Sequence, residues 1–576
     1  MTNMINQRHE ELTVDVLVLG SGAAGLSAAL YSAKKGLTVL VCEKSSRLGG
    51  TTALSNGMIW IPSSKQAQTA GIKDSIVNAE TYLKGELAEF YQADFIDALL
   101  KDGPTAISEL EDDTQVKFTL ASAPDYHSSR VGGVDKGRAL SPAPYDGRLL
   151  TKNDFNLIAN PIRVLLGGMM ISSSEINKFL NPFKSWDAFQ HVMGRIGRYA
   201  FDRLEYRRGT ELSGGNALIA RFLISLRKLN VEIWTQAPLS EICIENGRAV
   251  GGLIGRQGTT IRVKARHGVI LATGGFARNA ALRVEISGPH QHSQTLVHED
   301  VKGEAIQLAR HLGASLDTEV ASPGFWTPVS LLPTKSSEAQ IVPYGWLDRG
   351  RPGVIAVGPN GRRFVNESNS YHDVCIGLFE NGYPKDDRFY FICDYEFVKK
   401  RGMGQILPWP WTLSISGYER TGYIQVARSI KDLALKIGID PDALETTVDH
   451  HNENVISGVD SEFGRGESAF NHALGDVSVG TKNPNLGPIR RGPFIALKIV
   501  PATLGTASGL KTDTESRVTR ADGSPIQGLF ACGNDMTSPM RGKYPGAGIT
   551  IGPGIVFAYR AVEAILQESD HHEKRT

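Results

Sequence analysis

Three glycines near the start of the chain have the spacing of a phosphate-binding loop. The segment GSGAAG places Gly20, Gly22 and Gly25 directly after the apolar run VDVLVL, and an amphipathic helical pattern follows. Such a loop lets the backbone approach a pyrophosphate, to which the next helix offers unpaired N–H groups and a partial positive charge. Glu43 ends the next apolar strand and can accept hydrogen bonds from a ribose. Strand, loop, helix, strand and acid together predict a dinucleotide site.

A second glycine-rich segment, RGKYPGAGITIGPG, lies near the end of the chain and leads into an apolar helical pattern. It contains Tyr544 and, four positions later, Gly548. The tyrosine hydroxyl and the glycine N–H can therefore point at one carbonyl oxygen, which is the arrangement of an oxyanion hole. Gly548 also lets a bulky ring approach the backbone. Pro553 suits the first turn of the last helix, whose N-terminal dipole we expect to face the cofactor.

Further segments indicate FAD as the dinucleotide. GGTTALSNG follows the acid and is rich in Gly, Ser and Thr, whereas a nicotinamide Rossmann domain continues into its next strand and helix. HGVILATGGFARN and GLFACGND are apolar strands that end in glycine or polar turns, and strand ends so distant in sequence can converge on one long cofactor. The predicted cofactor-binding residues are Gly20, Gly22, Ala23, Ala24, Gly25, Glu43, Lys44, Gly50, Thr51, Thr52, Ser55, Gly57, Ala272, Thr273, Gly274, Gly533, Asn534, Gly548, Thr550 and Ile551.

The cofactor segments lie at both ends of the chain, so the middle is predicted to be an insertion. The expected fold class is α/β: a Rossmann-like FAD-binding domain made of residues 1–290 and 485–576, with an inserted α+β capping domain at 291–484 that covers the flavin. Turns at Asn246–Gly247 and Asp522–Gly523 predict short antiparallel strands. Residues 154–208 are predicted to form a helical excursion, with a lid or a membrane-facing element as the alternative.

The composition excludes several classes of protein. A net charge of +1 over 576 residues gives no reason to expect a nucleic-acid partner. The five cysteines are scattered and form no CxxC pair, which predicts reduced thiols in the cytoplasm and neither a disulfide framework nor a metal site. The polar N-terminus has no signal-peptide pattern, and no apolar run approaches the ~18 residues of a membrane span. An exposed apolar surface at 164–172 would still allow peripheral membrane contact, and the oligomeric state stays open.

The cofactor segments resemble those of the FAD-dependent fumarate reductase and 3-ketosteroid dehydrogenase superfamily over nearly the whole chain. GSGAAG, Glu43, GGTTALSNG, ATGGFARN and ACGN carry this resemblance. The fumarate reductase branch has a His-Pro-Thr signature, but the corresponding VASPGFWTPVSLLP lacks the histidine and has Phe325 and Trp326 instead. A small dianionic substrate needs arginine and other polar groups, so this aromatic segment argues against one.

Three tyrosine motifs resemble those of the 3-ketosteroid Δ1-dehydrogenase family. They are PDYHSSRVGG with Tyr126, RRFVNESNSYHD with Tyr371 and KYPGAGITIGP with Tyr544. The related Δ4 enzymes usually lack the proline of the YPGxG turn. The chain departs from the family at Ser508, where a glycine is usual, and at KGE (302–304), where GDG is usual. SYHD is also similar to the Δ4 branch, so the substrate and the position of the double bond stay open.

The resemblance implies an FAD-dependent 3-oxosteroid 1-dehydrogenase with a role in steroid metabolism and lipid degradation. Its catalytic residues would be Tyr126, Tyr371, Tyr544 and Gly548. The implied reaction removes a proton from C2 and transfers a hydride from C1 to flavin N5, which creates a C1–C2 double bond in ring A. Tyr371 would be the base, with Tyr126 as the neighbour that activates it, because a free tyrosine has a pKa of about 10. An unidentified electron acceptor other than dioxygen would reoxidise the flavin.

Alternative functions follow from the same motifs. The protein can be a Δ4-dehydrogenase or ene-reductase of another ring ketone, a fumarate reductase-like flavoprotein, or a flavoprotein subunit that relays electrons to a partner. Phe325, Trp326 and Trp346 are expected either to line an apolar substrate cleft or to belong to the capping core. His372 is expected at the surface, while Asn366 and Glu367 are expected to brace the capping domain.

Overall fold

A largely parallel sheet forms the base of the molecule in the computed structural model, which describes residues 11–161, 167–172, 175–288, 293–335, 338–343 and 349–573. The strand order is β22-β23-β11-β1-β2-β8. The strands of this path are β1 (Glu11–Leu19), β2 (Val39–Cys42), β8 (Glu232–Trp234), β11 (Thr259–Leu271), β22 (Arg517–Thr519) and β23 (Pro525–Ala531). All neighbours except β22 and β23 run parallel, so the carboxyl ends of β1, β11 and β23 lie at one edge.

The expected antiparallel hairpins extend this sheet. β9 (Leu239–Glu245) and β10 (Arg248–Arg256) pair through the turn at Asn246–Gly247, and β10 continues onto β11. The turn at Asp522–Gly523 likewise joins β22 to β23. Glycine at 247 and 523 adopts the positive φ that such turns require. Both turn predictions are confirmed.

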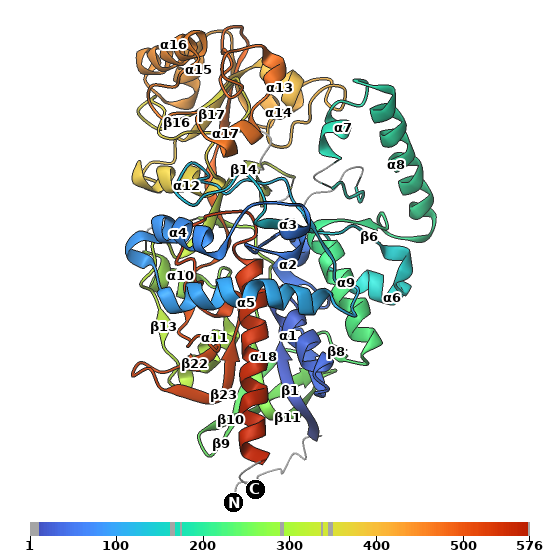
Figure 1. Ribbon diagram of the computed structural model, residues 1–576. Coiled ribbons are helices and arrows are strands. Elements are labelled where there is room, and N and C mark those ends of the chain that lie inside the picture. Colours follow the sequence, from blue (N-terminus) through green and yellow to red (C-terminus); the bar gives the residue numbers. More distant parts are fainter. Residues whose placement is uncertain are drawn as a thin grey trace, which may run out of the picture.

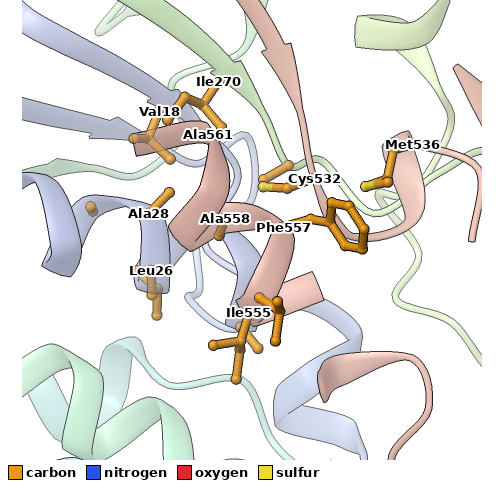
Figure 2. Close-up of a cluster of buried hydrophobic side chains, with 14 of the residues drawn as sticks. Val18, Leu26, Ala28, Ile270, Cys532, Met536, Ile555, Phe557, Ala558 and Ala561 are labelled. Atoms are coloured by element: carbon orange, nitrogen blue, oxygen red, sulfur yellow. The ribbon is translucent and has the colours of Figure 1, made fainter. Parts of the chain in front are cut away.

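Helices cover the sheet and bury its apolar faces. α18 (Ile551–Glu573) packs against α1 (Ala23–Lys34) and α5 (Ala93–Glu111), and α9 (Gly214–Lys228) packs on the other side of α1. Figure 2 shows Ala28 of α1 and Ala558 and Ala561 of α18 near the centre of this core, beside Val18 and Ile270 of the sheet. The small alanine side chains allow the helices to approach closely. The last helix is thereby fixed to the strands that carry the phosphate loop.

The inserted region forms the other end of the molecule and has its own sheets and cores (Figure 1). One sheet has the order β12-β20-β14-β15 and the other β16-β17-β19-β18. Their strands are β12 (Gln294–Thr295), β14 (Gly324–Leu332), β15 (Gln340–Pro343), β16 (Val354–Val357), β17 (Tyr390–Asp394), β18 (Gln425–Ala427), β19 (Phe494–Lys498) and β20 (Val500–Thr506). The helices α12 (Tyr371–Glu380), α15 (Ile430–Ile437) and α16 (Pro441–Ser457) accompany them. The fold class predicted from the sequence is confirmed.

The domain boundaries remain a prediction, which we propose to adjust at one end. β19 lies after residue 485 but pairs with β17 and β18, and β20 pairs with β14. We therefore propose that the chain returns to the FAD-binding domain after β20, near residue 507, and not at 485. The other boundary, at residue 290, lies outside the described residues.

The region from 154 to 208 is mainly helical where it is described. It contains most of α6 (Lys152–Leu157), α7 (Ile176–Leu180) and α8 (Trp186–Glu205), with α8 at the margin of the molecule (Figure 1). Met169 and Met170 are buried, against the expectation of an exposed apolar surface at 164–172, whose first three residues lie outside the described part. Met169 packs in a small cluster with Phe179 and Val192.

The structure bears on two further features, the cysteines and the helices that could cross a membrane. All five cysteines are buried, and none forms a disulfide. Among the described residues, no helix combines the length and the apolar character that crossing a membrane requires.

Candidate active site

The predicted phosphate loop has the backbone geometry that only glycine tolerates. Gly20 has a φ of +104°, and a Cβ atom there would lie 2.2 Å from the carbonyl oxygen of Ala272. A Cβ at Gly25 would lie 2.1 Å from the carbonyl oxygen of Gly20, so the third glycine lets α1 pack against the loop. Gly22 caps α1 without a side-chain hydrogen bond to the helix. In the first turn of α1, the N–H of Ala23 donates to Thr52 Oγ1 at 3.0 Å. The other N–H groups of this turn therefore remain available to an anion.

Glu43 lies beside this loop, at the end of β2. Its Oε2 accepts hydrogen bonds from the N–H (3.0 Å) and hydroxyl (2.6 Å) of Ser21, and its Oε1 accepts from the N–H of Ser45 at 2.8 Å. A carboxylate has about four acceptor sites, so capacity remains for a ribose hydroxyl. The adjacent Lys44 forms an ion pair with Glu304 at 2.7 Å.

A buried carboxylate that the sequence interpretation missed joins the ends of β11 and β23. Asp535 accepts hydrogen bonds from the N–H and hydroxyl of Thr273 and, at 2.8 Å, from the N–H of Gly275. Its side chain has no exposed surface. Asp535 follows directly on the ACGN motif, and this position in the sequence could have indicated its role. It holds the ATGG turn against the ACGN turn, as convergence on one cofactor requires.

Several of the remaining predicted cofactor residues lie in segments that contact α1 or the strand ends. A Cβ at Gly533 would lie 3.1 Å from the Cβ of Ala24, and a Cβ at Gly554 would lie 3.5 Å from it, so the ACGN turn and the start of α18 both contact α1. Thr51 accepts a hydrogen bond from the N–H of His298 at 3.1 Å. Thr52, Ser55 and Gly57 follow in α2 (Gly50–Leu54) and its C-terminal turn. The start of α1, the glycine turns and the carboxylate of Glu43 in one place fit FAD.

The three tyrosines singled out by the resemblance meet in the structure, although they lie far apart in the sequence. The Tyr126 hydroxyl donates to the Tyr371 hydroxyl at 3.0 Å, and the Tyr371 hydroxyl donates to the Tyr544 hydroxyl at 2.7 Å. The rings of Tyr126 and Tyr544 are stacked, with centroids 5.4 Å apart. Tyr126 and Tyr544 are buried and Tyr371 is half-buried. The result is a chain of three hydroxyls inside the protein.

Backbone contacts fix two of these tyrosines to one turn. The carbonyl oxygen of Pro545 accepts hydrogen bonds from the N–H of Tyr126 at 2.8 Å and from the hydroxyl of Tyr82 at 2.7 Å. Tyr82 belongs to α4 (Ile76–Leu87). The third tyrosine, Tyr371, is the first residue of α12, whose N-cap Ser370 accepts a hydrogen bond from the N–H of residue 373. Each hydroxyl is therefore held by an element that is itself anchored.

Gly548 closes the turn that begins at Tyr544. It has a φ of +96°, and a Cβ there would lie 2.4 Å from the carbonyl carbon of Ile59 in β3 (Ile59–Trp60). No other residue fits between the turn and this strand. Its N–H forms no hydrogen bond within the described part of the chain. This N–H is available to a ligand, as the sequence interpretation requires.

An ion pair that the sequence interpretation missed links the segments of Tyr126 and Tyr371. His127 contacts Glu86 through Nδ1 at 2.8 Å and Asp373 through Nε2 at 2.9 Å. Burial lowers the pKa of His127, but the two carboxylates outweigh it and raise this pKa to about 10. Burial acts to raise the pKa of Asp373, which His127 nevertheless lowers to about 2. The imidazolium therefore connects α4 and α12 throughout the neutral pH range.

Aromatic side chains surround the hydroxyl chain. The Phe325 ring stands edge-on to Tyr544 at 5.5 Å, and Phe470 lies 4.7 Å from Tyr126. Burial raises the pKa of all three tyrosines well above the ordinary value. The phenols are consequently neutral donors unless a nearby positive charge opposes this effect.

Several expectations about the capping region can now be judged. His372 is buried, not exposed, because it lies on the face of α12 that packs on β14: its Nδ1 accepts the N–H of Trp326 at 3.2 Å, and burial lowers its pKa to about 4. Trp326 belongs to the capping core, and Trp346 lies outside the described residues. Glu367 is buried between Arg363 and Arg465, so its bracing role is confirmed.

Comparisons with known proteins identify the class and the family. A model described as the FAD binding domain matches residues 15–551, so the protein is a flavoprotein with FAD as its cofactor. The chain is 34% identical over 576 residues to the 3-oxosteroid 1-dehydrogenase of Mycolicibacterium smegmatis, covering 95% of this chain and 96% of the relative. It belongs to the family of FAD-dependent oxidoreductases that contains the 3-oxosteroid 1-dehydrogenases.

Two further comparisons bear on the substrate. The chain is 35% identical over 565 residues to the 4-oxocyclohex-2-ene-1-carboxylate 5-dehydrogenase of Sinomonas cyclohexanicum, covering 96% of this chain and 94% of the relative. The crystal structure of the 3-ketosteroid delta1-dehydrogenase from Sterolibacterium denitrificans, in complex with 1,4-androstadiene-3,17-dione, matches with a TM-score of 0.88 and 30% identity. That match covers 96% of this chain and 100% of the solved one.

Proposed function

We propose that this protein is an FAD-dependent 3-oxosteroid 1-dehydrogenase that introduces a C1–C2 double bond into ring A of a 3-ketosteroid. The observation that carries the proposal is the chain of hydrogen bonds from Tyr126 through Tyr371 to Tyr544, next to the N-terminus of α18. The aromatic surroundings of this chain suit an apolar ring system with a single carbonyl oxygen.

Tyr544 and Gly548 hold the substrate carbonyl in this proposal. Within the chain of hydroxyls, Tyr544 accepts a hydrogen bond from Tyr371, which leaves its own proton for the substrate oxygen. The N–H of Gly548 is the second donor. The C2 proton is only weakly acidic, and two donors on the oxygen stabilise the enolate that forms when this proton leaves.

Tyr371 takes the proton from C2, and Tyr126 connects it to the rest of the protein. The two hydroxyls are 3.0 Å apart, which is within the range for proton transfer between a base and its neighbour. Bound FAD supplies the acceptor for the hydride that leaves C1. The chain of hydroxyls and the hydride acceptor would then lie on different sides of the ring, so that proton and hydride leave in different directions.

A second candidate has support from one comparison, the relative that acts on a 4-oxocyclohexene carboxylate. Desaturation next to a ring ketone needs the same carbonyl donors and the same base, so the tyrosines serve either substrate. The two candidates differ in the rest of the substrate, because a carboxylate requires a cationic anchor and a steroid requires apolar surface. The remaining alternatives, a Δ4-dehydrogenase or a fumarate reductase-like enzyme, rest on resemblance of the fold.

A comparison of turnover with a steroid ketone and with a cyclohexanone carboxylate tests the proposal. The purified holoenzyme is given androst-4-ene-3,17-dione or 4-oxocyclohexanecarboxylate with an artificial electron acceptor, and the products are identified by mass spectrometry and NMR. We expect a steroid product with a new C1–C2 double bond and a kcat/KM for the steroid at least tenfold above that for the acid. Turnover of the acid alone would replace the steroid proposal by the second candidate.

We also propose that α8 provides a peripheral membrane contact through which an apolar substrate reaches the enzyme. Trp186, Met193, Phe201 and Leu204 lie along one face of this helix, and their side chains are 49–83% exposed. The exposed Arg203 and the neighbouring cations suit anionic lipid headgroups. The physiological electron acceptor is not assigned.

A further inference from the structure

Arg349 is a buried cation that has no carboxylate partner among the described residues. Its side chain is 1% exposed, and its Nη1 donates to the backbone carbonyl oxygens of Glu367 and Asn369. Its Nε has no hydrogen-bond partner among the described residues. Nor does the described part of the chain place any Asp or Glu within ion-pair distance of it. A buried charge without a counter-ion is costly, so its position calls for an explanation.

Arg349 is linked to the candidate active site through the carbonyl oxygen of Asn369, which lies two residues before Tyr371 at the start of α12. Burial is the largest influence on the pKa of Arg349, which it lowers to about 10, and Tyr126, Asp373 and Tyr371 follow as its electrostatic neighbours. In return, the charge of Arg349 acts to lower the pKa of Tyr126 and of Tyr371, against the larger effect of burial. At neutral pH the guanidinium is charged and the phenols lie within its field.

Most of the other charged groups near the tyrosines form ion pairs with one another. Asp373 pairs with His127, and Glu86, the second partner of His127, pairs with Arg130 at 2.7 Å. Asp125, next to Tyr126, pairs with Arg138 at 2.7 Å, and Arg138 also binds Asp74. His372 is neutral because of its low pKa, and the half-buried Lys543 acts on His372 from the Tyr544 turn. Among the described residues, Arg349 is thus a buried charge next to the Tyr371 segment that forms no ion pair with an acid, although Asp373 acts on it through space.

We propose that Arg349 is a positioning residue whose charge stabilises the tyrosinate form of the hydrogen-bonded Tyr126–Tyr371 pair. The inference rests on the proposed function, in which Tyr371 is the base. The Tyr371 oxygen, as tyrosinate, takes the proton from C2, the electron pair of that C–H bond forms the C1–C2 double bond, and the hydride leaves C1 for the oxidant FAD. The proton then leaves Tyr371 through Tyr126, which restores the tyrosinate for the next turnover.

The first test replaces Arg349 by neutral and charged side chains. The amide of Arg349→Gln still donates hydrogen bonds to the carbonyl oxygens, whereas Arg349→Lys keeps the charge. Because one pKa unit corresponds to a tenfold change in the tyrosinate fraction, we expect Arg349→Gln to move the acidic limb of the kcat/KM profile about one pH unit upward. Activity at pH 7 falls roughly tenfold and recovers at alkaline pH, while Arg349→Lys stays close to the wild type.

Arg221→Gln is the matched control, because Arg221 also donates only to backbone carbonyls but its charge acts on Tyr145 and not on the active site. This variant should leave the profile unchanged. Equal losses of activity at every pH in Arg349→Gln, together with an unshifted tyrosinate step, would overturn the proposal, since they would indicate a purely structural role. Should the glutamine variant lose FAD, Arg349→His repeats the test, because a free histidine is neutral above a pKa of about 6.5 and still donates a hydrogen bond.

A second measurement separates this inference from the proposed function. Tyrosinate formation is followed by ultraviolet difference absorbance in the holoenzyme without substrate, and the step that disappears in Tyr371→Phe is assigned to the pair. We expect this step at higher pH in Arg349→Gln than in the wild type. An unshifted step contradicts the inference even if the steroid is turned over, and a shifted step supports it even if the substrate proves to be a different ketone.

Discussion

At the scale of single residues, the chemistry depends on where three hydroxyl protons point. Tyr544 lies at the end of the chain of hydrogen bonds, because it accepts from Tyr371 and has no hydroxyl beyond it in that chain. Its partner Gly548 must be glycine to pass the backbone of Ile59. The donor pair is therefore rigid before the substrate binds, and such preorganisation is what makes an oxyanion hole effective.

Replacing Tyr544 by phenylalanine tests this donor. The ring stays stacked on Tyr126, so we expect FAD to remain bound and the fold to be preserved, while kcat falls by about 10²–10³ because one oxyanion donor is lost. Steady-state kinetics and the flavin spectrum are the measurements. Tyr31→Phe is the control, since it also removes a buried hydroxyl bond, to the carbonyl of Ala106, but away from the active site. Unchanged kcat in Tyr544→Phe would exclude the donor role.

At the scale of elements, the proposed active site is a junction between α4, the Tyr126 segment, α12 and the turn before α18. His127 holds two of these together, because it binds Glu86 of α4 and Asp373 of α12. Since Asp373 is two residues after Tyr371 and His127 directly follows Tyr126, this ion pair also sets the distance between the two phenols. The ion pair thereby connects α12 of the inserted region with α4 and the Tyr126 segment.

The raised pKa of His127 predicts how stability depends on pH. In the folded protein this pKa is about 10, whereas an unfolded histidine titrates at about 6.5. Its contribution is therefore complete below pH ~6.5 and is lost as the pH rises towards 10. We expect Tm to decrease over this range, and to decrease less in His127→Gln, which should be less stable at pH 6. Parallel Tm profiles of the two proteins would contradict this assignment.

The same elements show what could be predicted from the sequence. The phosphate loop and the tyrosine motifs could be recognised because each lies in one short segment with a characteristic pattern. His127 and Arg349 could not, because their roles depend on partners in other segments of the chain, and for Asp535 only its place after the ACGN motif was a signal. His372 was misjudged because its burial depends on which face of α12 packs on β14. The domain boundary that we propose to move past β19 depends on strand pairing, which is not visible in a single strand.

At the scale of the whole molecule, an apolar helix face lies at the margin, apart from the site (Figure 1). We expect the full-length protein to float with anionic lipid vesicles in a density gradient, and less so after the double substitution Phe201→Ser with Leu204→Ser. Leu435→Ser, on the exposed face of α15, is the control for loss of any exposed leucine. Equal flotation of all three proteins would exclude α8 as the contact, and turnover of a dissolved steroid should be the same in each.

The central claim, that the tyrosine chain and FAD together desaturate a 3-ketosteroid, is tested most directly by one half-reaction. The oxidised holoenzyme is mixed anaerobically with androst-4-ene-3,17-dione, without any acceptor, and flavin absorbance is recorded while the steroid is analysed. We predict bleaching of the flavin and one equivalent of the 1,2-unsaturated ketone per FAD, with bleaching slowed strongly in Tyr371→Phe. A flavin that stays oxidised, or that is reduced equally fast in Tyr371→Phe, would contradict the account.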